Sequence, residues 1–251
     1  MRIAIWGNSG SGKSTLAIKL ALSLVSAKKD VMLFDTDYAA PQFNVWYPKK
    51  NMVSTSSLSV LLDNAVTAEA LSSKSQKIKD NLVCYGYCKD FASNSIPSRS
   101  DTALQLMNLL GDPKGKFNEF YSVIDCMSCP ITDYLSYAAL TSADAVIVAF
   151  TPDVKGMSWY DANVKMFEEN WKDNKKLVIR AFNQATITSP TSNIENILGT
   201  MEYYLPYDRA LKEELYSGNL GSNSYKQNAR NYANVVDTMR EQLVDAWGKR
   251  Y

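Results

Sequence analysis

Residues 3–15 read Ile3-Ala-Ile-Trp-Gly7-Asn8-Ser9-Gly10-Ser11-Gly12-Lys13-Ser14-Thr15. An apolar stretch of strand length leads into a glycine-rich turn and then into the start of a helix, which is the context that the pattern G-x-x-x-x-G-K-[ST] requires. In such a loop, consecutive backbone N–H groups curl around a phosphate, and residues without a β-carbon allow the close approach. The stretch therefore predicts a phosphate-binding loop within an α/β domain.

The polar groups of this loop have separate expected tasks. We expect Lys13 to reach the β and γ phosphates of a nucleoside triphosphate and Ser14 to offer its hydroxyl to Mg²⁺. Thr15 either contacts the α-phosphate or only caps the helix. The candidate nucleotide-binding residues of the loop are Gly7, Asn8, Ser9, Gly10, Ser11, Gly12, Lys13, Ser14 and Thr15. The simpler alternative is a serine-glycine turn before a helix. It does not account for the combination of strand, lysine and helix in this order.

Apolar stretches of strand length alternate with segments of helical period along the chain. This alternation predicts an α/β fold, with a mostly parallel twisted sheet and helices on both faces, as in P-loop nucleoside triphosphatases. We expect strands at Arg2–Trp6, Val31–Phe34, Leu82–Tyr85, Tyr121–Ile124, Ala145–Phe150, Leu177–Phe182 and Tyr203–Leu205. We expect helices at Lys13–Ser26, Ile131–Leu140, Trp159–Trp171 and Tyr225–Trp247. The irregular residues 38–100 are expected to decorate one sheet edge, with an exposed loop at Ser93–Ser100.

Composition sets limits on the function. The chain has 251 residues, 46% hydrophobic and 21% charged, and we expect a single domain over 1–251 with an amphipathic C-terminal helix at 225–247. The net charge of +1 sets up no global field toward a polyanion. Histidine is absent, which excludes Ser-His and Cys-His nucleophiles and His-ligated metals. No apolar run approaches the roughly 18 residues of a membrane span, so we expect a cytoplasmic protein.

Acidic residues follow two of the expected strands. In a phosphate-binding fold, carboxylates at the ends of neighbouring strands hold the metal and order the attacking water. We expect Asp125 to bind Mg²⁺ through water, Asp35 to support the water shell of the metal and Asp37 to orient the attacking water. One alternative is that Asp125 caps the helix expected from Ile131. Another is that Asp35 and Asp37 only form a turn before Pro41.

Taken together, these segments resemble the ParA/MinD group of P-loop ATPases from Met1 to about Leu220. Asp35-Thr-Asp37 is similar to the D-x-D of that group, and Tyr121-Ser-Val-Ile-Asp125-Cys126 is similar to its Walker B strand. Residues 141–153, which end in Thr151-Pro152-Asp153, are similar to a strand that ends in threonine-proline in that group. The resemblance implies that ATP and Mg²⁺ are the cofactors.

Two further segments extend the resemblance toward the base of the nucleotide. Val178-Ile-Arg-Ala-Phe-Asn183 and Leu205-Pro206-Tyr207-Asp208 stand where the group has its base-binding asparagine and its proline loop. The resemblance implies that Asn183 hydrogen-bonds adenine and that the loop around Pro206 covers it. The alternatives are an asparagine that merely ends a strand and a proline that merely forms a turn.

One position departs from the pattern of the group. The resemblance implies a second, signature lysine directly after the first glycine, which reaches the partner's phosphates across an ATP-bound homodimer, but Asn8 stands there. A cation of this kind resembles an arginine finger, which is worth on the order of 10³ to 10⁵ in rate. Either hydrolysis is slow and the protein works as an ATP-occupancy switch, or another cation such as Lys155 or Arg209 takes this role.

Atypical relatives define the alternatives. The pilus-assembly and cell-pole branch of the ParA/MinD group often has irregular P-loops. Phe34-Asp35-Thr-Asp37-Tyr-Ala-Ala-Pro41 also resembles the D-x-D-x-x-x-P segment of bacterial tyrosine kinases. Those kinases end in a tight tyrosine cluster, whereas Tyr225, Tyr232 and Tyr251 are widely spaced here. A non-hydrolysing scaffold and a tyrosine kinase are therefore the alternatives to an ATPase.

Weaker signals concern metals, membranes and DNA. Cys126 and Cys129 have C-x-x-C spacing, but two thiolates need a second chain to complete four metal ligands, so we expect structural thiols. The apolar stripe of the last helix favours packing on the sheet over membrane contact. Non-specific DNA binding would use cations such as Lys172, Lys175, Lys176 and Arg180, although such runs are more often solvated. We expect an ATPase switch that positions or partitions a cargo through a protein partner or adaptor.

Overall fold

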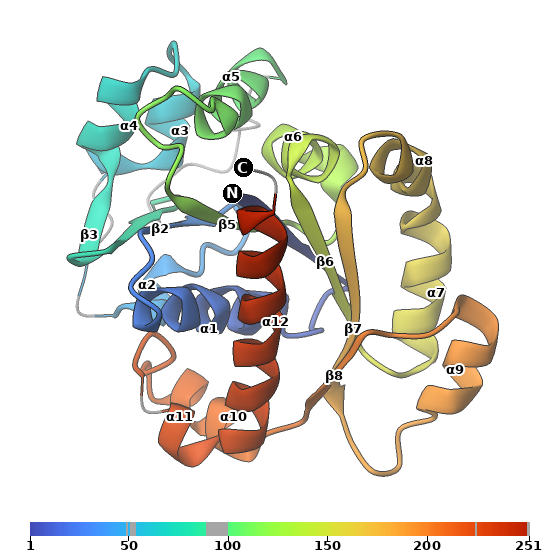
Figure 1. Cartoon of the computed structure of the whole chain (residues 1–251). Helices are drawn as coiled ribbons and strands as arrows, with labels where there is room; N and C mark the ends of the chain where they lie inside the picture. Colours follow the sequence, from blue (N-terminus) through green and yellow to red (C-terminus); the bar gives the residue numbers. More distant parts are fainter. Residues whose placement is uncertain (49, 51–53, 89–99, 224, 250–251) are drawn as a thin grey trace.

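The structure is a computed structural model that describes residues 1–48, 50, 54–88, 100–223 and 225–249 (Figure 1). Its centre is one sheet of eight strands in the order β3-β4-β2-β5-β1-β6-β7-β8. Neighbouring strands are parallel, except that β3 and β4 are antiparallel. The strands are β1 (Arg2–Trp6), β2 (Val31–Asp35), β3 (Gln76–Lys79), β4 (Leu82–Tyr85), β5 (Tyr121–Asp125), β6 (Ala145–Phe150), β7 (Leu177–Ala185) and β8 (Tyr203–Pro206). The expected α/β fold with a mostly parallel sheet is confirmed.

Helices cover both faces of this sheet (Figure 1). The longer ones are α1 (Lys13–Ser26), α5 (Ser100–Gly111), α6 (Tyr134–Ser142), α7 (Val154–Asn163), α8 (Lys165–Asp173), α9 (Thr191–Leu198), α10 (Arg209–Tyr216) and α12 (Arg230–Gly248). The shorter ones are α2 (Phe43–Trp46), α3 (Leu58–Leu62), α4 (Ala68–Lys74) and α11 (Tyr225–Asn228), with 3₁₀ turns η1 (Ser54–Ser56) and η2 (Pro130–Thr132).

The alternation of side chains along β1 explains the two layers. Ile3 and Ile5 belong to a core shared with α1 and α12, whereas Ala4 and Trp6 belong to a second core shared with α5, α6 and α8. Successive residues of a strand point to opposite faces, and a parallel sheet covered on both faces therefore needs apolar residues at every position. This is why the central strands read as continuous apolar runs.

The strand order brings the candidate site together. β1 lies between β5 and β6, and β2 lies on the far side of β5. The register pairs Ile5 with Asp125 and pairs Asp35 with Asp125. Because the carboxyl ends of parallel strands meet at one edge of the sheet, the loops after β1, β2 and β5 share a single crevice.

One helix prediction is wrong at its start. We expected a helix at Ile131–Leu140, but η2 comes first and α6 begins only at Tyr134. The reason is the buried Asp133, whose carboxylate accepts hydrogen bonds from Leu135 N and Ser136 N at 3.3 and 2.8 Å. An N-cap that satisfies free N–H groups fixes where a helix begins.

Two segments that we expected to be single long helices each consist of two helices. The segment expected at Trp159–Trp171 starts earlier, at the cap Asp153, and consists of α7 and α8, although Val164 between them keeps right-handed helical dihedrals. The segment expected at Tyr225–Trp247 consists of α11 and α12, separated at Ala229 by a non-helical backbone with φ −116° and ψ 55°.

The chain between residues 38 and 88 holds more regular structure than expected. It contributes α2 to α4 and the antiparallel edge strand β3, which the sequence analysis missed, as it missed α5, α9 and α10. These elements lie toward one edge of the sheet, as expected (Figure 1). Of the loop expected at Ser93–Ser100, residues 93–99 lie outside the described residues.

The apolar stripe of α12 faces inward. Its buried residues are Tyr232, Ala233, Val236, Met239 and Leu243, and they belong to the core shared with α1. Among the described residues, no helix combines the length and the apolar character that a membrane-crossing segment needs. The stripe is thus used for packing inside the protein.

Replacing Asp133 by Ala should lower the free energy of unfolding by about 1–2 kcal/mol, because α6 loses a buried N-cap. Urea unfolding followed by circular dichroism measures this change. Asp161→Ala is the matched control: Asp161 is an exposed residue of α7 whose ion pair with Lys165 lies at the surface, so the expected change is within about 0.5 kcal/mol. Equal losses in the two variants would contradict the assignment of the cap.

Candidate functional site

The loop between β1 and α1 has the backbone of a phosphate cradle. Gly10 and Gly12 have φ of 78° and 82°, a conformation that costs other residues free energy. Ser11 N donates to Asn8 O at 3.0 Å, so residues 8–11 form a tight turn with Gly10 at its third position. Gly12 then directly precedes α1, whose N-terminus starts at Lys13. A helix N-terminus after such a turn favours anions.

Asn8 does not project toward solvent. Its side chain is buried, Nδ2 donates to Thr151 Oγ1 at 3.2 Å, and Oδ1 accepts from Thr151 N at 3.1 Å. Gly7 packs against the same strand end, since a β-carbon there would lie 1.8 Å from Ala149 O. In place of an outward-reaching lysine, this chain therefore has an amide that fastens the loop to the end of β6.

Asp125 ends β5 as a buried carboxylate. It is 2% exposed, and neither of its oxygens has a hydrogen-bond partner among the described residues. Burial raises the pKa of the Asp125 carboxyl to about 6, while the neighbouring Lys13 ammonium and Ser14 hydroxyl act in the opposite direction. The helix cap considered as an alternative role for Asp125 is supplied by Asp133. A buried carboxylate is stabilised by a nearby cation, by hydrogen-bond donors or by a proton.

Asp35 organises the loop that follows β2. Its oxygens accept hydrogen bonds from the backbone N–H groups of Asp37, Gln42 and Phe43 at 3.2, 2.5 and 3.1 Å. Burial, reinforced by the negative charge of Asp125, raises the pKa of Asp35 well above its ordinary value. Asp35 therefore lies beside Asp125 but is committed to the backbone, and its expected part in the metal's water shell stays a prediction.

Asp37 combines a turn with a place at the site. Its Oδ1 accepts from Ala39 N and Ala40 N at 3.1 and 2.9 Å, which is the turn chemistry considered as an alternative. The residue also lines the cleft described below, together with Lys13 and Ser14. The expected role of Asp37 in orienting the attacking water stays a prediction.

Thr36 joins the two acidic strand ends, and the sequence analysis missed it. The buried Oγ1 donates to Asp125 O at 2.8 Å and lies 2.8 Å from Ser136 Oγ, which in turn accepts from Met127 N at 2.9 Å. The loop after β2, the loop after β5 and the start of α6 thus share one polar contact. The only sequence signal was the position of a threonine between two aspartates, which by itself names no partner.

A cleft of about 490 Å³ opens in front of the loop. This volume lies within the range of about 300–1,000 Å³ that is typical of small-molecule sites. Of the residues singled out from sequence, its lining includes Ser9, Gly10, Gly12, Lys13, Ser14, Thr15, Asp37, Asn183 and Pro206. The remaining ones, Gly7, Asn8, Ser11, Asp35 and Asp125, are buried rather than in its lining. The structure therefore gathers the candidates from five strand ends around one crevice.

Gln184 is a further wall residue that sequence reasoning missed. Its φ of 60° is unusual for a residue other than glycine, and such strain tends to mark functional positions. Its Nε2 donates to Gly10 O at 2.6 Å, and its backbone N donates to Asn183 Oδ1 at 2.9 Å. The end of β7 thus contacts the phosphate loop at Gly10, and the bond from Gln184 N fixes the amide orientation of Asn183.

The far end of the cleft is partly aromatic and apolar. Tyr207 follows Pro206, and the Lys212 ammonium lies 5.3 Å from the centre of its ring. Leu211, Leu215 and Leu220 line the same end. A base with flat apolar faces suits this surface, whereas the loop at the other end suits phosphates. Apart from Tyr207, no sequence pattern pointed to these residues.

The residues present fit a magnesium ion that is bound together with phosphates. The described residues contain no cluster of three or more acidic or cysteine side chains that could hold a metal unaided. Mg²⁺ usually binds through one or two carboxylates plus substrate phosphates and water. Ser14 and the buried Asp125 beside it supply such a donor set.

The two cysteines of the C-x-x-C segment differ in exposure. Cys126 is buried with its Sγ near Ile124 O at 3.7 Å, and Cys129 is exposed. Between them, Ser128 O accepts from the indole N–H groups of Trp6 and Trp159 at 3.3 and 3.2 Å. These contacts suit structural thiols in a fixed loop.

Asp125→Asn should stabilise the ligand-free protein at pH 7.5. The folded pKa of about 6 exceeds the ordinary value of 3.8, so the folded state binds more protons and loses stability as the pH rises through this range. Removing the ionisable group should add roughly 1–3 kcal/mol to the free energy of unfolding at pH 7.5 and less at pH 5. Urea unfolding at both pH values, with a chelator present, measures the difference.

Asp144→Asn provides the control of opposite sign. Burial opposes ionisation of Asp144, but the Arg2 guanidinium, 3.0 Å away, outweighs it and lowers the pKa of that carboxyl. This variant should therefore lose stability at pH 7.5. A destabilised Asp125→Asn protein would show that the Asp125 carboxylate is satisfied in a way the structure does not contain.

Comparison with known structures agrees with this geometry. A ParA family ATPase from Chlorobium tepidum TLS superimposes with a TM-score of 0.76 at 16% identity, covering 96% of this chain and 98% of that chain. The cell division ATPase MinD of Pyrococcus furiosus gives a TM-score of 0.72 at 17% identity, covering 98% and 100%. A plasmid partition protein from Borrelia burgdorferi B31, bound to AMPPNP, gives 0.68 at 20% identity, covering 96% and 99%. At these identities the likeness shows the fold.

Sequence comparison supplies the family. A search of curated protein sequences finds no match. The family model described as an AAA domain, AAA_31, matches residues 2–179, a stretch that contains the phosphate loop, both acidic strand ends and the end of β6. Because this model matches more than half of the chain, the chain belongs to the AAA_31 family, and it has the fold of the ParA and MinD ATPases.

Proposed function

We propose that this protein is a Mg²⁺-dependent ATP-binding ATPase that works as a nucleotide-dependent switch in intracellular positioning or partitioning. The observation that carries the proposal is the buried Asp125 carboxylate at the end of the central strands, which forms no hydrogen bond of ordinary geometry with the described residues and has the Lys13 ammonium and the Ser14 hydroxyl beside it. A protein that never bound a metal with a phosphate ligand would gain stability by replacing this acid.

Different residues along the cleft would bind different parts of the nucleotide and its metal ion. The loop backbone from Gly7 to Gly12 and the Lys13 ammonium hold phosphate oxygens, and Ser14 and Asp125 hold Mg²⁺. Bound Mg²⁺ would neutralise charge that develops on the transferred phosphate. Asp37 positions the attacking water, with Asp35 fixing the loop that carries it. Asn183 offers its Nδ2 to the base, because Gln184 N occupies its Oδ1, and the loop around Pro206 covers the base.

Similar structures support this choice of ligand and role. The Borrelia burgdorferi protein is a plasmid partition protein bound to AMPPNP, a nucleotide analogue. The Pyrococcus furiosus protein is a cell division ATPase. A MinC:MinD complex from Aquifex aeolicus, with a TM-score of 0.71, joins an ATPase of this fold to a protein partner. By analogy, the chain would act in the cytoplasm as an ATP-dependent homodimer with a protein partner or cargo adaptor.

We expect slow intrinsic turnover because of Asn8, unless another cation such as Lys155 or Arg209 takes the role of the absent lysine. Its amide is bonded to Thr151 and carries no charge, so it cannot stabilise phosphates in a partner subunit. The alternative of a scaffold that binds ATP without hydrolysing it rests on the same contact. Phosphate release equal to a protein-free control, with ATP bound, would favour the scaffold.

Other roles receive less support. For DNA binding, two candidate cations are engaged within the protein, since Lys176 Nζ donates to Ala143 O at 2.7 Å and Arg180 lies 3.7 Å from Glu168. For a tyrosine kinase, Tyr232 is buried in the core, and the side chains of Tyr225 and Tyr251 lie outside the described residues. Mass spectrometry after incubation with ATP tests autophosphorylation directly.

Lys13→Ala should weaken ATP binding by about 10- to 100-fold, since a charge-assisted hydrogen bond to phosphate is worth about 1.5–3 kcal/mol. Isothermal titration calorimetry with Mg²⁺ present gives the dissociation constant. Lys77→Ala, on the exposed edge strand β3, is the control and should leave it unchanged. Unchanged affinity in Lys13→Ala would remove the assignment of the phosphate site.

ATP with Mg²⁺ should convert the protein from monomer to dimer, and Asp37→Ala should retain the dimer longer because hydrolysis is blocked. Multi-angle light scattering without nucleotide, with ADP and with ATP gives the mass in each state. A mass that stays constant in all states, for both proteins, would rule out the switch and leave the scaffold.

A further inference from the structure

A polar stripe runs along one side of the otherwise apolar helix α1. Thr15, Lys19 and Ser23 are spaced four residues apart, so they share one side of the helix. Thr15 lines the cleft, whereas Lys19 and Ser23 are fully buried. Because lysine is rarely buried unless it is paired, the contacts of Lys19 show what this side of the phosphate-loop helix holds in place.

The Lys19 ammonium joins α1 to the C-terminal part of the chain. Its Nζ donates to Glu214 Oε2 at 2.6 Å, to Leu220 O at 2.7 Å and to Ser222 O at 3.4 Å. Burial lowers the pKa of Lys19, and Glu214 opposes this shift. The three donors of one ammonium therefore reach both α10 and the turn that follows it.

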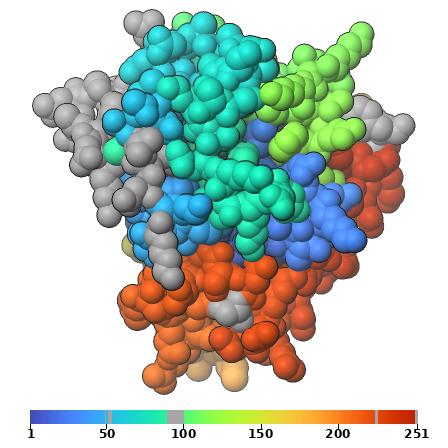
Figure 2. All heavy atoms as spheres, turned by 90° about the vertical axis from the view of Figure 1, so that its left-hand side faces the viewer, coloured from blue at the N-terminus to red at the C-terminus, as the bar shows by residue number. Residues whose placement is uncertain are grey.

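These acceptors lie directly behind the apolar end of the cleft. Leu211 and Leu215 flank Glu214 on α10 and line the cleft, and so does Leu220, whose carbonyl receives Lys19. The turn also contacts the last residue of α2, since Gly221 N donates to Trp46 O at 3.1 Å. Figure 2 shows this C-terminal segment (orange) against the blue and teal part of the chain. Lys19 thus connects this wall to the helix that begins at the phosphate loop.

We propose that the Lys19–Glu214 ion pair is a positioning device that sets the distance between the phosphate loop and the wall that receives the nucleoside base. The proposal rests on the proposed function, since it assumes a nucleotide in the cleft. A buried ion pair adds little stability compared with apolar side chains of the same volume, but its directional contacts allow one arrangement of the helices. Apolar replacements would keep the helices packed and lose the fixed spacing.

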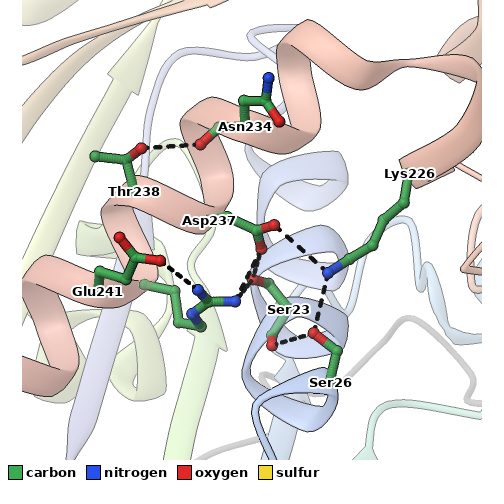
Figure 3. A network of polar contacts seen from close by, with 8 residues as sticks. Ser23, Ser26, Lys226, Asn234, Asp237, Thr238 and Glu241 are labelled. Carbon is green, nitrogen blue, oxygen red and sulfur yellow. Dashed lines mark hydrogen bonds and ion pairs between the residues drawn. The ribbon is translucent and has the colours of Figure 1, made fainter.

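A second polar network on the same side of α1 provides the control. One turn further from the loop, Ser23 Oγ is hydrogen-bonded to Asp237 of α12 and accepts from Arg240 Nη1 at 3.2 Å, and Lys226 Nζ donates to Ser26 Oγ at 3.0 Å (Figure 3). This network also holds α1 against the C-terminal helices, but its members are not in the lining of the cleft.

The test compares ATP with inorganic triphosphate, which fills the phosphate site and leaves the base site empty. In the double variant Lys19→Met/Glu214→Leu, the dissociation constant for Mg-ATP should rise about tenfold, while that for Mg-triphosphate should stay unchanged. Ser23→Ala should change neither constant. Circular dichroism and thermal melting verify that the double variant folds.

The outcomes separate the inference from the proposed function. If the wild-type protein binds neither ligand, the proposed function fails and the inference fails with it. If the wild type binds both and the double variant binds ATP as tightly as the wild type, only the inference is overturned. An equal loss for ATP and triphosphate also overturns it, because the pair would then act on the phosphate site or on overall stability.

A measurement on the unaltered protein covers the case in which the variant does not fold. Hydrogen exchange in α10 and in the turn around Leu220 should slow with Mg-ATP and stay unchanged with Mg-triphosphate, whereas the loop from Gly7 to Gly12 should be protected by both. If Mg-ATP does not change the rate of hydrogen exchange in α10, the proposal is overturned.

Discussion

A loop whose backbone N–H groups point at a phosphate cannot be held by the regular hydrogen bonds of a strand or a helix, so it has to be fastened from outside. In this protein two carboxamides do so. Asn8 reaches back to Thr151 at the end of β6, and Gln184 reaches Gly10 O from the end of β7. Because β6 lies beside β1 and β7 lies next to β6, both side chains are within reach of the loop.

The acidic side of the site carries an energetic cost. Asp35 and Asp125 end adjacent strands in register and are both buried; burial raises the pKa of each carboxyl, and the charge of Asp125 raises that of Asp35 further. Asp35 is compensated by backbone N–H groups, whereas Asp125 forms no hydrogen bond of ordinary geometry with the described residues and has the Lys13 ammonium and Ser14 hydroxyl as neighbours. Such an imbalance is typical of functional positions, where a ligand completes what the protein leaves open. In the proposed function, a Mg²⁺ ion bound together with phosphate would compensate the Asp125 carboxylate.

The C-terminal helices belong to the site as much as the phosphate loop does. α10 lines the cleft, and α12 shares a core with α1. Polar contacts from Lys19 and Ser23 hold both helices to the helix that starts at the phosphate loop. The signature motifs occupy only the strand ends, and the matching family model stops at residue 179, so this second half of the cleft depends on contacts that no motif describes.

The sequence by itself determined the glycine-rich loop, the positions of most strands along the chain and the acids that follow them. These features are local: the loop needs glycine at particular positions, and a buried strand needs a continuous apolar run. It also singled out Asn183 and Pro206, which do line the cleft. Helix limits were less determined, because a cap such as Asp133 or a break such as Ala229 acts through single contacts.

Only the tertiary structure decided what the polar side chains do. Asn8 could be read from sequence as a missing lysine, but its bond to Thr151 joins residues 143 positions apart. Lys19 lies on an otherwise apolar helix, and its structural role depends on Glu214, 195 positions away. Thr36 and Gln184 likewise act through partners on other strands and loops. Contacts of this range leave no periodic trace in a sequence, since a hydrogen bond needs a direction and a distance that only the folded chain provides.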